Sequence, residues 1–223
     1  MKTLLSIDRT VRILDTVTAH PGEYTLSALS KLLDVPVTTL HGFCATLEHW
    51  NLLQKDAAGR FQLGYRFLHY AFSCSNEQQL NAVVHPYLVE LSRRFDETFH
   101  VGILRGDHII YIDKAESQKP YRMTSVIGTM DAYQDSAVGL VLLALQGREI
   151  PEDYLAHSND ILRDGFCLKF EPQMHAYCLG VALKTTPPWL AGISAVIPDY
   201  SCTPELVQEI VAEINRIPPI LPQ

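Results

Sequence analysis

The sequence has few of the features that mark enzymes and metal proteins. Its five cysteines are scattered and odd in number, and they form neither a CxxC pair nor a Cys/His spacing typical of zinc. None of the motifs GxSxG, HExxH, GxGxxG or the phosphate-binding P-loop occurs. We therefore expect reduced thiols in a protein that is not an enzyme and holds no metal or cofactor.

Long apolar runs are also missing. No stretch of about twenty apolar residues is available to span a membrane, and residues 1–8 lack the apolar region of a signal peptide. These absences predict a cytoplasmic protein with no membrane contact. Hydrophobic residues make up 47% of the 223 residues, which is enough for buried cores in about two domains.

An excess of positive charge is the third absence. The net charge is −7, but the first 75 residues carry seven basic and six acidic side chains, so the acidity lies in the remainder. Neutralisation of phosphates supplies most of the non-specific affinity of proteins for DNA. A DNA-binding region in the first part would therefore bind weakly as a single protomer, or depend on a dimer.

Residues 24–63 have the pattern of a winged helix-turn-helix. The first short helix has an apolar face, formed by Leu26, Leu29, Leu32 and Leu33. Pro36 ends it, because the residue before a proline avoids the helical region. The second helix, about residues 37–50, also has an inward face, formed by Leu40, Phe43, Cys44 and Leu47. Two predicted strands, 52–55 and 60–63, follow as a wing. Such a motif places its second helix in the major groove of DNA.

The regions around this motif have their own patterns. Residues 6–19 predict a supporting helix with Ser6 as N-cap. Its apolar side is formed by Ile7, Val11, Leu14 and Val17, with Ile13 flanking them. Residues 64–75 predict a linker helix of the kind that pairs two protomers. The second part is α+β, an antiparallel sheet flanked by helices. Strands are predicted at 98–104, 108–113, about 122–127, 177–183 and 189–197, and helices at 80–95, 137–145, 153–163 and 203–217.

A candidate ligand site lies at the start of the apolar helix 137–145. Its first turn consists of Ser136, Ala137, Val138 and Gly139. Free backbone N–H groups and the positive end of the helix dipole favour a carboxylate there. The preceding loop, with Met130 and Tyr133, would cover the site. The simpler alternative is that Ser136 is an N-cap and nothing more.

The order of these elements and several local strings resemble the IclR family of bacterial transcriptional regulators, over about residues 6–217. The matching strings are SIDRTVRIL at 6–14, ATLE at 45–48, GRFQLG at 59–64, TFHV at 98–101, YIDKAES at 111–117 and SAVG at 136–139. The resemblance implies a winged helix-turn-helix domain at 1–64, a linker helix at 65–79 and a GAF-like effector-binding domain at 80–223. It also implies a homodimer or homotetramer that represses or activates transcription from an operator in double-stranded DNA, according to a small organic acid.

The recognition helix departs from the family pattern. Family members usually begin it with Pro-Lys-Ser-Thr and carry an arginine five residues after the lysine. Val37 and Gly42 stand at these two positions, so both usual cations are missing. Losing a bidentate arginine would weaken the reading of guanine by about 1–3 kcal/mol. The candidate DNA contacts that remain are Thr38, Thr39, His41 and Gly42 in this helix, Thr25 and Ser27 before it, Arg60 in the wing and Arg9 in the first helix.

The resemblance also assigns pocket residues in the second part. Cys178 matches a pocket cysteine of the family and Ser194 the first of two pocket serines, whereas Val196 replaces the second. Lys169 stands where family members carry an acidic residue, which adds a candidate cation for an acidic ligand.

Two alternatives remain open. The chain is either a DNA-binding regulator or a diverged ligand-sensing, oligomerising protein that has lost DNA binding, as the missing cations allow. A catalytic or metal-binding pair of Cys178 with His175 or His100 lacks a third group that would orient it.

Overall fold

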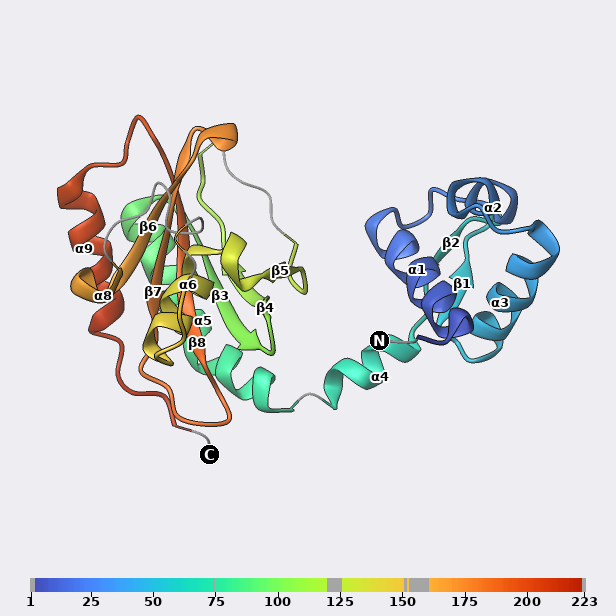
Figure 1. The fold of residues 1–223 in the computed structure, drawn as a ribbon, viewed down its shortest axis with the longest axis horizontal. Helices are drawn as coiled ribbons and strands as arrows, with labels where there is room; N and C mark the ends of the chain where they lie inside the picture. Colours follow the sequence, from blue (N-terminus) through green and yellow to red (C-terminus); the bar gives the residue numbers. More distant parts are fainter. Residues whose placement is uncertain (1–2, 74, 120–125, 151, 153–160, 222–223) are drawn as a thin grey trace. The chain divides into compact units, whose positions relative to one another are not determined.

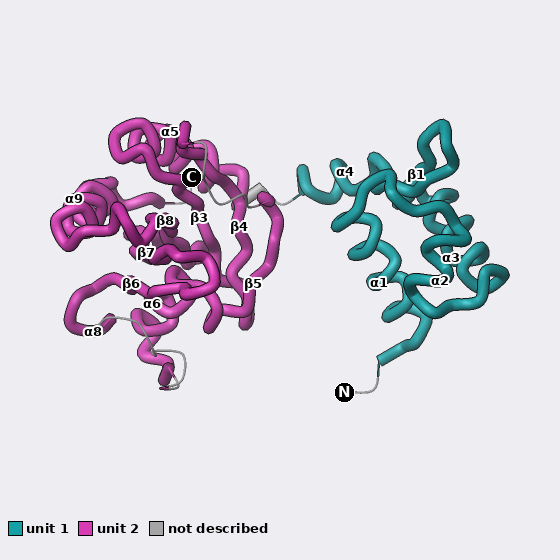
Figure 2. The backbone as a smooth tube through the Cα atoms, turned by 90° about the horizontal axis from the view of Figure 1, so that it is seen from above, with its two compact units in different colours: residues 1–74 teal, residues 75–223 magenta. Residues whose placement is uncertain are grey.

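The structure is a computed structural model that describes residues 3–73, 75–119, 126–150, 152 and 161–221. They divide into two compact units, residues 1–74 and residues 75–223 (Figures 1 and 2). The expected division at residues 1–64, 65–79 and 80–223 stays a prediction. None of the described helices is both long enough and apolar enough to cross a lipid bilayer.

Unit 1 is a winged helix-turn-helix (Figure 1). Its elements are α1 (Leu5–Ala19), α2 (Leu26–Leu33), α3 (Val37–His49), β1 (Leu53–Lys55), β2 (Phe61–Leu63) and α4 (Arg66–Phe72). Strands β1 and β2 pair antiparallel as the predicted hairpin. One apolar core joins α1, α2, α3 and the hairpin, with Leu29, Leu40 and Phe61 almost completely buried.

The turn between α2 and α3 has a specific local cause. Asp34 adopts the left-handed conformation at φ 53°, which ends α2. The buried Ser30 hydroxyl donates a hydrogen bond of 2.6 Å to the carbonyl oxygen of Val35, whose own N–H donates to the Ser30 carbonyl. Pro36 then stands as the N-cap of α3, so the two helices meet at a fixed, short turn.

The predicted apolar side of α1 is correct for Leu14 and Val17, which pack in the core of unit 1, and wrong for Ile7 and Val11. Ile13 and Val17 are the buried residues, whereas Ile7 and Val11 are 59% and 48% exposed. The helix is rotated so that its buried stripe is Ile13 and Val17, at i and i+4. The helix also begins at Leu5 with Leu4 as N-cap, so Ser6 is not the cap.

One smaller prediction for unit 1 is also wrong, and the N-cap of α2 has no side-chain hydrogen bond. Leu32 is 53% exposed, because α2 turns Leu29 and Leu33 to the core instead. Thr25 does occupy the N-cap position of α2, yet its side chain makes no capping hydrogen bond.

Unit 2 is the predicted α+β domain, built on a six-stranded antiparallel sheet of order β5-β4-β3-β8-β7-β6. The strands are β3 (Thr98–Arg105), β4 (His108–Ala115), β5 (Met130–Ala132), β6 (Phe166–Glu171), β7 (Ala176–Ala182) and β8 (Ala191–Pro198). The helices are α5 (Ser75–Phe95), α6 (Ala137–Leu145), α8 (Ile161–Asp164) and α9 (Pro204–Asn215), with short 3-10 turns η1 (Tyr133–Asp135) and η2 (Pro172–Met174).

The helices cover both faces of the sheet (Figure 1). Apolar side chains of α5 and α9 form one core with the sheet, and those of α6 form a second core on the other side. Helix α6 lies unusually close to the sheet, because a Cβ added at Gly180 of β7 would come within 2.4 Å of the backbone of Ala137 and Val138. Glycine at position 180 therefore fixes where α6 begins.

The strand predictions for unit 2 are correct except at the two edges of the sheet. Strand β6 was not predicted. The strand expected near 122–127 falls in large part on residues 120–125, which lie outside the described residues, and the observed partner of β4 is β5. Most of the helix expected at 153–163 also lies outside the described residues, and α8 covers its last part.

Candidate functional site

The outward face of α3 carries four of the predicted DNA contacts. Leu40, Cys44 and Leu47 are buried in unit 1, and the opposite side of the helix is exposed. The exposed residues there include Thr38, Thr39, His41 and Gly42. A Cβ added at Gly42 would meet no atom within 4 Å, so this side of the helix is open within its unit.

The predicted contacts at the start of α2 are also accessible. Thr25 and Ser27 are both exposed, and Thr25 has extended backbone just before the helix. The first N–H groups of a helix lack intrahelical acceptors, and their positive end suits a phosphate. Helix α2 is only eight residues long, so we count Thr25 and Ser27 as supporting contacts rather than as a site of their own.

The wing holds its cations in ion pairs. The Asp56 carboxylate accepts hydrogen bonds from the backbone N–H groups of Ala58 and Arg60 and from Nε of Arg60, at 2.8–2.9 Å. These bonds, first among them the one from the Arg60 backbone, lower the pKa of Asp56. Lys55 Nζ lies 2.8 Å from the Glu48 carboxylate. Arg60 therefore reaches DNA only with its remaining N–H groups or by leaving Asp56.

Three other cations of unit 1 have no acidic partner in the described part of the chain. Arg9 is half-buried, and Arg12 and Lys31 are exposed; none of the three has a carboxylate within 4.0 Å among the residues with assigned positions. Arg9 was predicted as a contact. Lys31 was missed, although its place in the last turn of α2, directly before the turn, was visible in the sequence.

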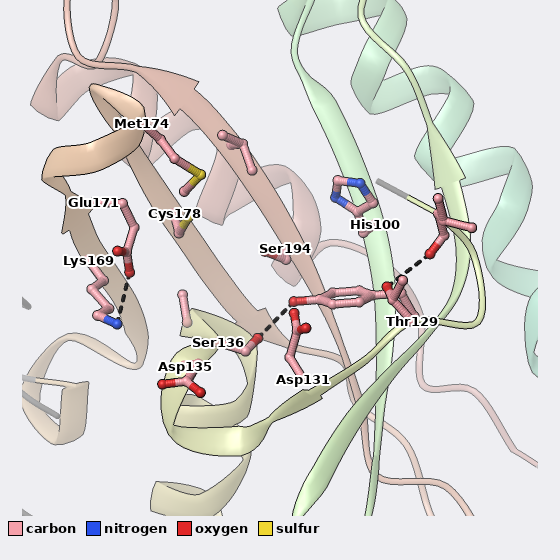
Figure 3. A pocket seen from close by; sticks show the side chains of 14 residues that line it. His100, Thr129, Asp131, Asp135, Ser136, Lys169, Glu171, Met174, Cys178 and Ser194 are labelled. Atoms are coloured by element: carbon pink, nitrogen blue, oxygen red, sulfur yellow. Dashed lines mark hydrogen bonds and ion pairs between the residues drawn. The ribbon is translucent and has the colours of Figure 1, made fainter. Parts of the chain in front are cut away.

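Unit 2 contains a cavity of about 470 Å³ beside the start of α6 (Figure 3). Strands β3, β4, β6, β7 and β8 and the segment from Val126 to Ala137 contribute its lining. The lining residues are His100, Tyr111, Val126, Thr129, Asp131, Asp135, Ser136, Ala137, Lys169, Glu171, Met174, Cys178, Ser194 and Val196. The predicted ligand site thus coincides with a real cavity.

Five of the nine predicted effector contacts line this cavity, and four do not. The five are Ser136, Ala137, Lys169, Cys178 and Ser194. Val138 and Gly139 are buried in the packing of α6, since Val138 lies against Gly102 and Gly192 and Gly139 lies against the Tyr133 carbonyl. The Met130 residue is 66% exposed, and Tyr133 is half-buried with Arg148 over its ring.

A chain of hydrogen bonds runs along the cavity wall. The Gly139 N–H donates to Ser136 Oγ, which caps α6. The Tyr111 hydroxyl lies 3.0 Å from Ser136 Oγ, and either of the two hydroxyl groups can be the donor. Burial raises the pKa of Tyr111 to about 12. One of the two hydroxyl protons is therefore used between these side chains.

The charged side chains of the cavity are mostly acidic. Lys169 Nζ lies 2.8 Å from the Glu171 carboxylate, so the expected extra cation is already paired. Burial, assisted by nearby Lys114, lowers the pKa of His100 to about 4, which leaves its ring neutral at pH 7. Burial raises the pKa of Asp131, a hydrogen bond from Tyr111 opposes the rise, and the like charge of Asp135 adds to it.

The cysteine of the cavity is a poor nucleophile and metal ligand. Burial raises the pKa of the Cys178 thiol to about 12, and only a thiolate attacks or coordinates well. In the described part of the chain, no group of three or more His, Cys, Asp and Glu side chains is arranged to hold a metal ion. Cys178 therefore lines the cavity as an uncharged, polarisable thiol.

Several lining residues escaped the sequence prediction. His100 and Tyr111 come from neighbouring strands, and their rings lie 5.6 Å apart, a contact that depends on strand register. Asp131 lies in the loop that was expected to cover the site, and Asp135 directly precedes the cap Ser136. Two acidic residues so close to a helix N-terminus were a visible signal that the protein itself supplies negative charge there.

Comparison with known proteins gives concordant matches to two parts of the chain. Residues 6–57 match the IclR helix-turn-helix domain, and residues 72–162 match the family described as bacterial transcriptional regulator IclR C-terminal. Together they cover more than half of the chain.

Named relatives are similar over part of their length. The transcriptional regulator XynR of Escherichia coli is 30% identical over 148 residues, which are 66% of this chain and 59% of XynR. The regulator KipR of Bacillus subtilis is 29% identical over 136 residues, 61% of this chain and 54% of KipR. The chain thus spans little more than half the length of these relatives. Both carry the names of transcriptional regulators, in line with the expectation of a non-enzyme.

Solved structures show the same fold. An IclR homologue from Microbacterium hydrocarbonoxydans, crystallised in complex with 4-hydroxybenzoate, has a TM-score of 0.75 at 20% identity. The alignment covers 94% of this chain and 97% of that one. The expected architecture, a helix-turn-helix unit followed by an antiparallel-sheet unit, is confirmed.

Proposed function

This chain belongs to the IclR family of bacterial transcriptional regulators, and on that premise we propose that it binds an operator in double-stranded DNA. Helix α3 and the wing make the contacts, and a small molecule in the cavity of unit 2 controls the affinity. The protein acts in the cytoplasm, where its DNA is.

The open outward face of α3 is the observation that carries this proposal. A helix-turn-helix reads DNA by placing its second helix in the major groove. Thr38, Thr39 and His41 offer hydroxyl, methyl and imidazole groups to base edges or phosphates, and all three are exposed. Gly42 has no side chain, so the backbone of α3 can come close to the DNA at that point.

Phosphate contacts come from few cations. Arg9, Arg12 and Lys31 have no acidic partner among the positioned residues, whereas Lys55 and Arg60 are paired. Three phosphate contacts give a slope of about −3 for the logarithm of affinity against the logarithm of salt concentration. Such a protomer binds weakly, and two protomers on one operator would double the number of contacts.

Exposed apolar side chains of unit 1 support a homodimer or homotetramer. Two groups stand out, on α1 and on the segment that includes α4. They are Leu4, Leu5, Ile7 and Val11, and Tyr65, Leu68, Tyr70 and Phe72, each between 46% and 72% exposed. Exposed apolar patches of this kind are typical of protein–protein contacts. We propose that α1 and α4 form the contacts between protomers.

The class of ligand follows less directly from the family. The related structure holds an aromatic acid, 4-hydroxybenzoate, and a small organic acid was expected from the free N–H groups at the start of α6. The acidic lining of this cavity does not favour an anion, and its ligand class is argued separately below.

A second candidate function keeps the ligand and the oligomer but not the DNA. The ion pairs of Arg60 with Asp56 and of Lys55 with Glu48 favour it, because they neutralise the wing. This protein would be a sensor that acts on another protein.

Selection of duplexes from a random library by the purified full chain separates the two candidates. We expect an enriched sequence that the protein binds at least tenfold more tightly than an unselected duplex at 50 mM salt. Thr39→Glu should abolish this binding, because it adds a negative charge on the outward face of α3. Gln208→Glu makes a similar change on an exposed position of α9 and should bind as the unchanged protein does. No enrichment, or equal loss in both variants, would contradict DNA reading by α3.

A further inference from the structure

The mouth of the cavity is acidic. Asp131 and Asp135 lie on the same side of the cavity, next to Ser136 (Figure 3). Both are exposed residues, and neither has a basic side chain within 4.0 Å in the part of the chain that the structure describes. An entering ligand therefore meets two carboxylates that no described cation neutralises.

The other charges of the cavity do not reverse this sign. Lys169 is paired with Glu171 at 2.8 Å, and these two charges offset each other. His100 is 4% exposed and neutral at pH 7. The dipole of α6 contributes about half a positive charge at its start. Two carboxylates outweigh it, so the place where a ligand carboxylate was expected is already taken by carboxylates of the protein.

The interior of the cavity offers a separate polar contact. Ser194 is 5% exposed and lines the cavity, and its hydroxyl makes no hydrogen bond to another described residue. Because no fully buried side-chain oxygen or nitrogen lacks a partner among the described residues, this hydroxyl is accessible from the cavity, where it can pair with a ligand or a water. Met174 and Cys178, labelled in Figure 3, also line the cavity and contribute sulfur and apolar atoms. Val196 adds a further apolar side chain to the lining.

From these features we propose that the cavity binds a small organic cation, an amine with an apolar or aromatic body, and discriminates against carboxylates. The ammonium group lies at the mouth between Asp131 and Asp135. The body lies inside against Met174 and Val196, and a hydroxyl or other polar atom of the ligand pairs with Ser194. This ligand class rests on the proposed function, in which the same cavity holds the effector.

Three probes with the same ring isolate the effect of charge. They are 4-hydroxybenzylamine, 4-hydroxybenzyl alcohol and 4-hydroxybenzoate, whose head groups are cationic, neutral and anionic at pH 7. Calorimetric titration of the full chain should rank their affinities in that order, with the amine at least tenfold tighter than the acid. Equal or tighter binding of the acid, or no binding of any of the three, would overturn the proposal.

Charge variants locate the effect. Asp135→Asn should weaken binding of the amine at least threefold and leave binding of the alcohol unchanged. Glu209→Gln removes the same charge at an exposed position of α9, and it should change neither. Equal effects of the two variants would show that only the overall charge of the protein matters, which contradicts the assigned site. Circular dichroism of each variant confirms that it is folded.

The DNA assay keeps this result separate from the proposed function. If the amine binds as expected but leaves the affinity for the selected duplex unchanged, the ligand class stands and regulation by this cavity fails. If the acid, and not the amine, changes the affinity for DNA, regulation stands and the ligand class is wrong.

Discussion

An alanine at position 42 tests whether the outward face of α3 is open or covered. Gly42 is the sixth of the thirteen residues of α3, and a Cβ built there meets no atom within 4 Å. Glycine in the interior of a helix is about 0.8–1.0 kcal/mol less favourable than alanine. With no clash to offset this gain, Gly42→Ala should stabilise unit 1 by about that amount.

Gly59, in the wing, provides a matched control. A Cβ at Gly59 also meets no atom within 4 Å, but its φ is +74°. An L-residue in the left-handed region costs about 1–2 kcal/mol. The same substitution in equally empty surroundings should therefore destabilise unit 1 at position 59 and stabilise it at position 42, because only the backbone conformation differs.

Hydrogen exchange of the full chain, followed by mass spectrometry, measures both effects in unit 1 directly. A gain of about 0.9 kcal/mol slows exchange of the protected amides of α3 about fivefold, and the control should accelerate it at least fivefold. If Gly42→Ala does not slow amide exchange in α3, the reasoning is refuted. Such a result would mean that the added methyl group meets a neighbour, so this face of α3 is covered in the assembled protein and is not available to DNA.

The remaining predictions concern charge, packing and assembly. Acidification from about pH 6.5 to pH 4 should lower the free energy of unfolding, measured in urea, by on the order of 3 kcal/mol. The reason is that His100 becomes protonated in the unfolded chain, whereas in the folded protein its buried ring has a pKa of about 4 and stays neutral. His100→Gln should flatten this slope, and an unchanged slope would exclude His100. Gly180→Ala should lower the free energy of unfolding of unit 2 by about 1–3 kcal/mol and weaken ligand binding, because the added Cβ comes within 2.4 Å of the α6 backbone. An unchanged free energy of unfolding would contradict that packing. Gly42→Arg should make the salt slope of DNA binding more negative by about 0.9, and an unchanged slope would place position 42 away from phosphate. Val11→Glu should dissociate the oligomer in sedimentation, and an intact oligomer would exclude α1 from the contact.

Binding of an amine should also depend on pH, with a sign fixed by Asp131. The raised pKa of this carboxyl means that it loses its charge earlier than usual as the pH falls. Affinity for 4-hydroxybenzylamine should therefore decrease on acidification, as Asp131 becomes protonated. Tyr111, His100, Lys169 and Glu171 also face the cavity, but His100 stays neutral down to about pH 4. Affinity that rises on acidification would contradict the assignment.

Sequence reasoning predicted the helices and central strands well, because their causes are local. Pro36 and the left-handed Asp34 separate α2 from α3, and Thr203 caps α9 through its hydrogen bond from the Leu206 N–H. Alternating and helical patterns of apolar residues sufficed for the remaining core elements. Strand β6 was missed because its pairing with β7 joins an edge strand to the sheet, which no local pattern reveals.

The direction of helix faces was harder to predict. Ile7 and Val11 have the spacing of a buried stripe, but α1 turns them outward and buries Ile13 and Val17 in the core of unit 1. An apolar stripe that forms contacts between protomers has the same periodicity as one that fills a core. Periodicity alone therefore could not distinguish the two.

The sequence prediction named five of the residues that line the cavity, but none of its acidic residues. The cap Ser136 fixed the position of the site in the sequence, since a helix start with a serine N-cap is a local feature. Lys169 and Glu171 lie two residues apart in β6, so their ion pair is a local contact that the sequence already allowed. The approach of Tyr111 to Ser136 instead joins β4 to the start of α6, and it depends on how these two elements pack.

Photo-crosslinking from α3 to duplex DNA tests the central claim most directly. A photoreactive amino acid replaces Thr39 in the full chain, and in a control it replaces Gln208 on α9. With the labelled selected duplex bound, position 39 should form a covalent product with the DNA, and position 208 should form none. An excess of the same duplex without the label should prevent the product at position 39. Products with protein alone at position 39, or equal DNA products at both positions, would contradict the reading of DNA by this face of α3.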